Sequence, residues 1–267
     1  MARGVFALPC LAIAAVLLRK PISTQAAGWV RLRSLMLVAA WVAYYASLPL
    51  LDLATAAVAV YTNPIMTALL AALVLRERVR AQQWLGVVLG FLGIAIILRP
   101  GSESFTPALF LPLLSAALYS GAMVLTRAKC RGESFVAMAI SLNLWFVIAG
   151  LAGLAIIAPM AAGLGQQGTA PFLLGGWNAM TTWDWGIVAL LGLITATFTI
   201  LVARAYQIAP PHIIGTFDYA YVGFAVLWGV VLFSETPDTQ TLGGMAMVIG
   251  AGLLVARPPR NAASATA

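Results

Sequence analysis

The chain has 267 residues, of which 62% are hydrophobic and only 9% are charged. A soluble domain carries about a quarter charged residues, so this composition excludes a water-exposed globular protein and indicates an integral membrane protein. The net charge of +7 does not indicate a nucleic-acid partner, because the basic residues form no clustered domain with interleaved aromatic residues.

Nine apolar runs follow one another along the chain. A spanning helix needs about 20 mostly apolar residues, each adding 1.5 Å of rise. Runs of this kind lie near residues 4–18, 34–51, 53–75, 82–98, 106–126, 135–159, 183–203, 211–233 and 241–256, separated by prolines, glycines or charged residues. The sequence therefore predicts an all-α polytopic membrane protein with nine spans.

The basic residues predict the orientation of these spans. Lysine and arginine accumulate in cytoplasmic loops. Of the 15 basic residues, 13 follow the first, third, fifth, seventh and ninth spans, whereas Arg3 and Arg99 lie on the other side. This sorting supports the count of nine. It predicts a cytoplasmic C-terminus and, for this chain as given, an N-terminus outside.

Two segments 158 residues apart share a skeleton. "VLRERVRAQQWLG" begins at Val74 and "LFSETPDTQTLGG" begins at Leu232. The shared positions are Tyr61 with Tyr219, Glu77 with Glu235, and Gly86 with Gly244. An odd number of spans separates the copies, so the second is inverted and its glutamate lacks the arginines of a cytoplasmic loop. Inverted repeats are typical of transporters with a substrate site near the midplane, where the repeats meet.

The two longer stretches around these segments share a further pattern of small residues, an apolar run, a glutamate and a Gly-rich helix. They read "LATAAVAVYTNPIMTALLAALVLRERVRAQQWLGVVLGFLGIAIILRPG" and "RAYQIAPPHIIGTFDYAYVGFAVLWGVVLFSETPDTQTLGGMAMVIGAGLLVARP". Both resemble the EamA domain of the drug/metabolite transporter superfamily. The resemblance implies an inverted-repeat helical bundle, with a first repeat over residues 1–104 and a second over 105–257. The small, polar residues 258–267 are expected to form a disordered cytoplasmic tail.

The resemblance implies ten helices, five in each repeat, whereas nine are visible. "RGVFALPCLAIAAVLL" near the start resembles the second helix of the family, including Arg3 near its outer end. It has no signal-peptide cleavage site, so we interpret it as a retained span. The first family helix is therefore expected to be missing. A start site placed too late in the gene is favoured over a genuine nine-helix protein.

Asp218 is the only acidic residue well inside an apolar run. An acid at mid-span costs about 2.5–3.5 kcal/mol on insertion scales, and such residues usually face a cavity or a partner helix. Asp218 is therefore a candidate site for a substrate cation or a proton. The alternative is a carboxylate near a helix start, stabilised by the helix dipole. Tyr221, three residues on, shares its helix face, whereas Tyr219 partly turns away.

Other polar and aromatic residues are candidates for the substrate site. Tyr61 and Asn63 lie beside Pro64 in the third span, and a proline frees a backbone carbonyl that can bind substrate in a cavity. The alternative is a kink in which Asn63 bonds a neighbouring helix. An aromatic lining would suit a planar or amphipathic metabolite, although packing is favoured for each single residue; the candidates are Trp41, Tyr44, Tyr45, Tyr119, Asn143 and Trp145.

Glycines in the fourth span permit close helix approach. Gly86 and Gly90 form a GxxxG spacing that Gly93 follows, a pattern found where membrane helices pack closely. Internal packing is favoured over a homodimer contact. His212, after two prolines, is expected in a loop.

These features predict a secondary transporter, a permease of the bacterial inner (plasma) membrane, that moves a small organic metabolite by alternating access. The expected partners are that metabolite and membrane lipid, with no cofactor and no metal. The chain has no Walker-type loop, so we do not expect ATP hydrolysis. Coupling would come from an ion gradient, with Asp218 as the proton carrier, or from exchange.

Two other function classes remain as alternatives. A membrane enzyme would need a catalytic set of acids, histidines or cysteines, and the chain has one histidine and two separated cysteines. The protein is therefore not expected to be an enzyme. A non-transporting membrane subunit is the other alternative. The segment "FDYAYVGFAVLWGVVLFSETPD" faintly resembles importers of riboflavin or S-adenosylmethionine and leaves the substrate open.

Overall fold

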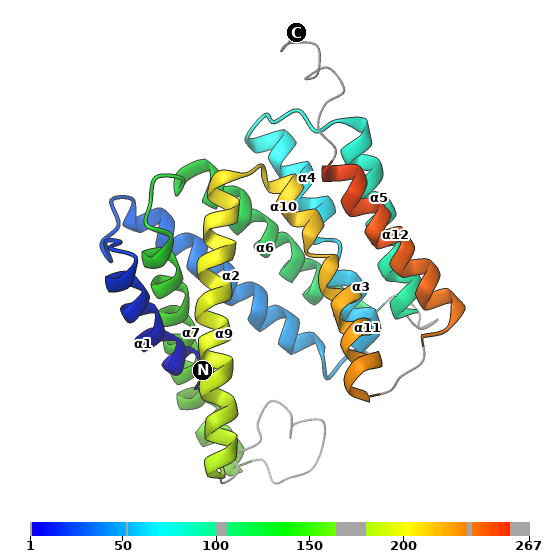
Figure 1. Ribbon diagram of the computed structural model, residues 1–267. Coiled ribbons are helices and arrows are strands. Elements are labelled where there is room, and N and C mark those ends of the chain that lie inside the picture. Colours follow the sequence, from blue (N-terminus) through cyan, green and yellow to red (C-terminus); the bar gives the residue numbers. More distant parts are fainter. Residues whose placement is uncertain (1, 52, 100–105, 164–179, 234–236, 257–267) are drawn as a thin grey trace.

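All the regular secondary structure in the part of the chain that the structure describes is helical. The computed structural model describes residues 2–51, 53–99, 106–163, 180–233 and 237–256. Its helices (Figure 1) are α1 (Ala2–Leu17), α2 (Ala27–Ser47), α3 (Leu53–Val60), α4 (Asn63–Val74), α5 (Ala81–Leu98), the short 3-10 helix η1 (Pro107–Leu109), α6 (Phe110–Lys129), α7 (Phe135–Gly163), α9 (Thr182–Ile208), α10 (Pro211–Phe217), α11 (Ala220–Phe233) and α12 (Thr239–Ala256).

These helices occupy the nine predicted spans, and the prediction of an all-α polytopic membrane protein is confirmed. Five helical stretches among the described residues are long and apolar enough to cross a membrane, and α1 and α12 are shorter apolar helices. Together with the helix α2 and the pair α10–α11, these make the nine helical segments that match the predicted spans among the described residues. One boundary was wrong: α2 begins at Ala27 rather than near residue 34, so Arg31 and Arg33 lie within the helix.

Two of the nine segments are broken in the middle. The first break separates Val60, the end of α3, from Asn63, the start of α4. Pro64 lies at the start of α4, where a proline is tolerated because the N–H of a first-turn residue has no helical partner. In the second break, Asp218 and Tyr219 donate backbone N–H groups three residues back, to Gly215 and Thr216. Such i to i−3 bonds tighten the chain and end the α-helix.

The helix boundaries repeat along the chain. α5 and α12 begin and end 158 residues apart, and α3 and α10 begin at the same spacing. Figure 1 shows α3–α4 running opposite to α10–α11, and α5 opposite to α12. The repeat visible in the sequence is therefore also present in the backbone, in inverted orientation. The predicted repeat boundary at residues 104–105, and the predicted tail at 258–267, lie outside the described residues.

Glycines allow α5 and α12 to pack closely. A Cβ added at Gly86 would lie 2.6 Å from Cγ2 of Val255. A Cβ at Gly93 would lie 2.8 Å from the carbonyl oxygen of Gly244, and one at Gly244 would lie 2.7 Å from that of Gly93. The prediction that these glycines serve internal packing is confirmed.

Buried apolar residues, both small and large, make the other helix contacts, while many large ones face outwards. One buried cluster joins α1, α7 and α9, and another joins α2, α6, α7 and α9. Many leucine, isoleucine, valine and phenylalanine side chains are exposed on the helices, among them Val16, Leu73, Phe198 and Leu253. An apolar outer surface of this kind is what a lipid bilayer solvates.

Candidate functional site

The two helix breaks face each other through Asn63 and Asp218. Asn63 is the first residue of α4, and Asp218 follows the last residue of α10. Nδ2 of Asn63 donates to Oδ2 of Asp218 across a long distance of 3.5 Å. The backbone carbonyl of Asn63 accepts from the hydroxyl of Ser120 at 2.9 Å. The pair therefore joins one residue of each copy of the repeated pattern, at the break in each copy.

Buried polar atoms with unused hydrogen-bonding capacity surround this pair. Tyr119 of α6 lies beside Asp218, and its side chain also interacts with Tyr206 of α9. Oδ1 of Asn63, Oη of Tyr206 and Oγ1 of Thr67 are buried without a partner in hydrogen-bonding geometry among the described residues. Thr67 and the Tyr206 hydroxyl both face Gly215 of α10. Because buried polar groups are nearly always hydrogen-bonded, such a concentration marks a place suited to a polar solute.

The repeat-related tyrosines take different positions. The ring centroids of Tyr61 and Tyr219 are 6.5 Å apart. Tyr219 is buried over Gly90 and donates its hydroxyl to the Val87 carbonyl at 3.2 Å, so it packs against α5. Tyr221 is 70% exposed and interacts with Tyr61. In this conformation Tyr219 serves packing, whereas Tyr221 is accessible.

The predicted aromatic residues of α2 form a cluster. The Trp41 ring centroid lies 5.5 Å from that of Tyr45 and 6.4 Å from that of Tyr44. The guanidinium of Arg3 lies 5.3 Å from the centre of the Trp41 ring, a cation–π distance. The predicted aromatic residues of α2 therefore pack against one another.

The structure does not place Asn143 next to Asn63 and Asp218. Asn143 of α7 is buried and donates its side-chain amide to the carbonyl of Ala139 at 3.0 Å and to the hydroxyl of Thr199 at 3.4 Å. It therefore connects α7 to α9, away from the contacts that surround Asp218.

An ion cluster that the sequence did not reveal lies where the α4–α5 and α9–α10 connections meet; we call this end of the bundle the basic end. Oε1 of Glu77 is 3.6 Å from Nε of Arg127, and Oε2 is 3.4 Å from Nδ1 of His212. Nη1 of Arg127 donates to the Gln207 carbonyl at 2.8 Å. His212, expected in a loop, is instead a buried residue of α10. The prediction failed because the two prolines before His212 begin this helix.

Arg33 of α2 is a second polar residue that sequence reasoning missed. It is 1% exposed, and its Nε donates to the Thr126 hydroxyl at 2.7 Å. Its Nη1 is buried and has no hydrogen-bond partner in the described ranges. The signal was present, because Val30, Arg33, Leu37 and Ala40 follow the spacing of one buried helix face.

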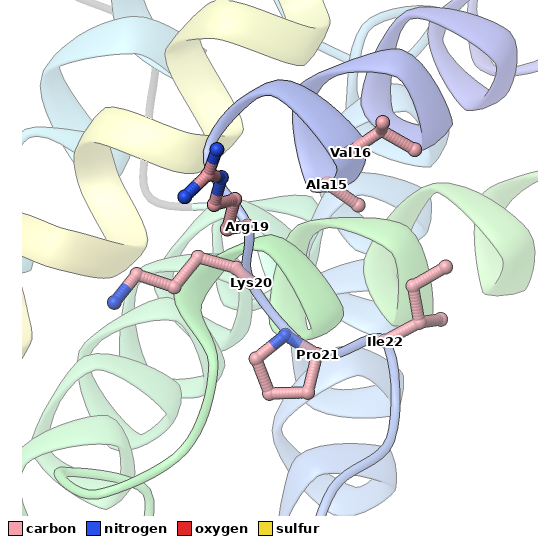
Figure 2. Close-up of a pocket in the computed structure, with 6 residues that line it drawn as sticks. All are labelled: Ala15, Val16, Arg19, Lys20, Pro21 and Ile22. Atoms are coloured by element: carbon pink, nitrogen blue, oxygen red, sulfur yellow. The ribbon is translucent and has the colours of Figure 1, made fainter.

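A hollow at the end of α1 is separate from these residues. It is lined by Ala15, Val16, Arg19, Lys20, Pro21 and Ile22. Figure 2 shows Arg19 and Lys20 extending to one side and Val16 and Ile22 to the other. None of the predicted site residues lines it, so we do not assign the substrate to this hollow.

Comparison with known proteins defines the class. Residues 1–99 match the EamA-like transporter family. The chain is 29% identical over 199 residues to a riboflavin transporter of Brucella anthropi, covering 73% of this chain and 64% of that protein. It is 22% identical over 233 residues to an S-adenosylmethionine uptake transporter of Rickettsia bellii, covering 87% and 74%. It is also 26% identical over 247 residues to a pseudopaline exporter of Pseudomonas aeruginosa, covering 90% and 78%.

The protein is thus a multi-pass helical membrane protein that carries an EamA domain, and the predicted resemblance to EamA-type transporters is confirmed. A solved crystal structure shares the fold, with a TM-score of 0.73 at 20% identity, covering 95% of this chain and 86% of that one. The matches span 64% and 66% of the lengths of two riboflavin transporters, from Brucella anthropi and Rhizobium johnstonii.

Proposed function

We propose that the protein is a secondary transporter that moves a small organic metabolite across the bacterial inner membrane by alternating access. The observation that carries this proposal is the contact between Asn63 and Asp218, made at the two helix breaks. Broken helices that meet at the repeat interface are where transporters of inverted-repeat design bind their solutes. The two repeats are taken as residues 1–104 and 105–257.

Asp218 is the central binding group in this proposal. Its hydrogen bond to Asn63 is long, so a solute cation or a proton can replace the amide at little cost. The carboxylate attracts positive charge strongly there, because few water molecules screen it. Asn63, Tyr61 and Tyr221 supply further contacts, and the aromatic residues Trp41, Tyr45 and Tyr119 extend the lining. Tyr219 and Asn143 support the helices around the site.

The basic end faces the cytoplasm in this proposal, as does the C-terminus. Most arginines and lysines belong to the loops and adjoining helix segments predicted for this side, as the positive-inside tendency requires. Single cysteines introduced at Arg78 and at Thr239 test the orientation in sealed vesicles. We expect an impermeant maleimide to label them from opposite sides. Labelling of both from the same side would contradict the inverted arrangement.

Flux through reconstituted vesicles tests transport. The full chain is placed in proteoliposomes, and counterflow of labelled riboflavin and labelled S-adenosylmethionine is measured, since proteins with these named substrates are relatives. We expect protein-dependent flux of at least one probe, and a loss of about 100-fold in Asp218→Asn, since removing a strong charge-assisted contact costs about 3 kcal/mol.

The matched control is Asp184→Asn, which neutralises an exposed acid at the start of α9. This variant should transport at the rate of the unmodified protein. Normal flux in Asp218→Asn, with both variants equally folded, would remove Asp218 from the mechanism. Absence of flux for these probes and for an amino-acid mixture would contradict the transporter proposal.

A further inference from the structure

The guanidinium of Arg33 is a buried charge that the proposed function does not explain. A cation removed from water costs several kcal/mol unless an anion compensates for it. Arg33 forms one side-chain hydrogen bond, to the neutral hydroxyl of Thr126, and its Nη1 is buried without a partner in the described part of the chain. A buried arginine in this state is poised to receive an anion.

The acids nearest this end of the bundle are already engaged. Glu133 accepts the backbone N–H groups of Gln25 at 3.0 Å and Ala26 at 2.7 Å. Glu77 contacts Arg127 and His212. Neither of these two acids is therefore in contact with Arg33 in the described part of the chain.

The thiol beside Arg33 is not its counter-ion. Cys130 caps the end of α6 near the guanidinium. Burial raises the pKa of the Cys130 thiol to about 11, so the thiol is neutral at physiological pH. The charge of Arg33 is therefore available to an anionic group that does not belong to the chain.

Packing links Arg33 to the polar atoms around Asp218. Tyr206 belongs to the same buried cluster as Leu37 and Met123, each of which lies about one helical turn from Arg33 or Thr126 on its own helix. Tyr119, which packs against this cluster, lies near Arg33 and beside Tyr206 and Asp218. Tyr119 and Tyr206 therefore lie near both the cation and the acid.

We infer that Arg33 binds the anionic group, a carboxylate or a phosphate, of the transported solute. Its guanidinium offers a planar set of donors that matches either group. Because Tyr119 also lies beside Asp218, the site suits a solute that carries both a negative group and a positive or proton-donating group. This inference rests on the proposed transport function and specifies its substrate class. The ion cluster of the basic end and Arg33 contact neighbouring residues of α6, Arg127 and Thr126.

The first experiment compares stability. Arg33→Met keeps the volume of the side chain and removes its charge, while Thr126 keeps its hydrogen bond to the Ala122 carbonyl. Because a buried, uncompensated charge opposes folding, we expect the unfolding temperature in neutral detergent to stay within about 1 °C or to rise by up to about 4 °C. Arg31→Met, on the exposed side of α2, is the matched control and should not change it. A fall of more than about 5 °C in Arg33→Met would assign Arg33 a structural role and overturn the inference.

The second experiment measures anion binding directly. Sodium acetate and inorganic phosphate are each added to the purified chain, against sodium chloride at equal ionic strength. We expect at least one to raise the unfolding temperature of the unmodified protein and of Arg31→Met, and neither to raise that of Arg33→Met. Equal responses in Arg33→Met and the unmodified protein, or no response in the unmodified protein, would overturn the inference.

Two further experiments distinguish this inference from alternative explanations. If a lipid headgroup were the anion, nanodiscs of phosphatidylglycerol would abolish the acetate or phosphate response that nanodiscs of phosphatidylcholine preserve, and solute binding at Arg33 would be rejected. If Asp218 itself were the partner in another state, the double variant Arg33→Met with Asp218→Asn would regain the flux that each single variant loses. Anion binding without flux would reject the transport proposal alone, whereas unchanged flux in Arg33→Met would reject only the role of Arg33.

Discussion

The two ends of the helix bundle are connected in different ways. At the basic end, the side chains of Glu77, Arg127 and His212 are only 23%, 15% and 5% exposed. At the opposite end, Arg99 after α5 pairs with Asp238 before α12, and both side chains are 49% exposed. Each contact joins the first copy of the pattern to residues of the predicted second repeat, 105–257, so the difference lies in burial.

The burial of each contact determines how much it contributes to the free energy of unfolding. An exposed ion pair contributes about 0–1 kcal/mol, because water and salt screen it and the side chains lose freedom. Separating a buried pair leaves a charge without compensation and costs about 3–5 kcal/mol. The ion contacts at the basic end are therefore expected to contribute more to stability than the exposed pair at the opposite end.

The largest expected effect comes from removing Arg127. Arg127→Met leaves the carboxylate of Glu77 with His212 as its remaining contact, and the Gln207 carbonyl loses its donor. We expect the free energy of unfolding to fall by about 2–3 kcal/mol, slightly less than for a fully buried pair. Denaturation of the purified protein in mild detergent measures it. Arg99→Met is the control, with an expected loss of at most about 0.5 kcal/mol; equal losses would refute the difference between the ends.

A smaller effect is expected for Glu77→Gln. The amide keeps the shape of the side chain, and Arg127 keeps its hydrogen bond to Gln207, so we expect a loss of about 1–2 kcal/mol. The same change should loosen the basic end. A cysteine at Thr67, buried in the unmodified protein, should react faster with a maleimide in the Glu77→Gln background. An unchanged labelling rate would show that Glu77 does not hold this end closed.

The smallest effect concerns pH at the opposite end. Hydrogen bonds from Arg99, and then from Thr241, hold the pKa of Asp238 well below its usual range. A depressed pKa contributes stability above the pKa of the unfolded chain, about 3.9, and this contribution is lost as the pH falls towards the folded value. We expect Arg99→Met to raise the pKa of Asp238, as measured by carboxyl NMR titration. An unchanged pKa would show that the ion pair does not form in solution.

The sequence predicted the helices well because hydrophobic length is a direct property of a membrane span. It also predicted the inverted repeat, since Tyr61 and Tyr219 mark equivalent positions. The breaks themselves were only partly visible. Pro64 indicated the first one, whereas no proline lies at Asp218, where backbone bonds three residues back interrupt the helix.

Side-chain partners could not be predicted in the same way. The glutamate of the repeat was recognised at Glu77, but Arg127 and His212 come from helices far along the chain, and only folding brings them together. Arg33 was counted as a loop residue because its charge favoured that interpretation. Its burial depends on α6, which supplies Thr126 as its hydrogen-bond acceptor.

The contact between α5 and α12 has a consequence for handling the protein. At Gly93 and Gly244 each helix meets the backbone of the other, with no side chain between them. Detergent tails and lipid chains need a crevice in which to insert, and this seam offers none. When solubilisation or heat loosens the remaining helices, this pair should therefore separate last, and fragments retained together after gentle proteolysis should contain both.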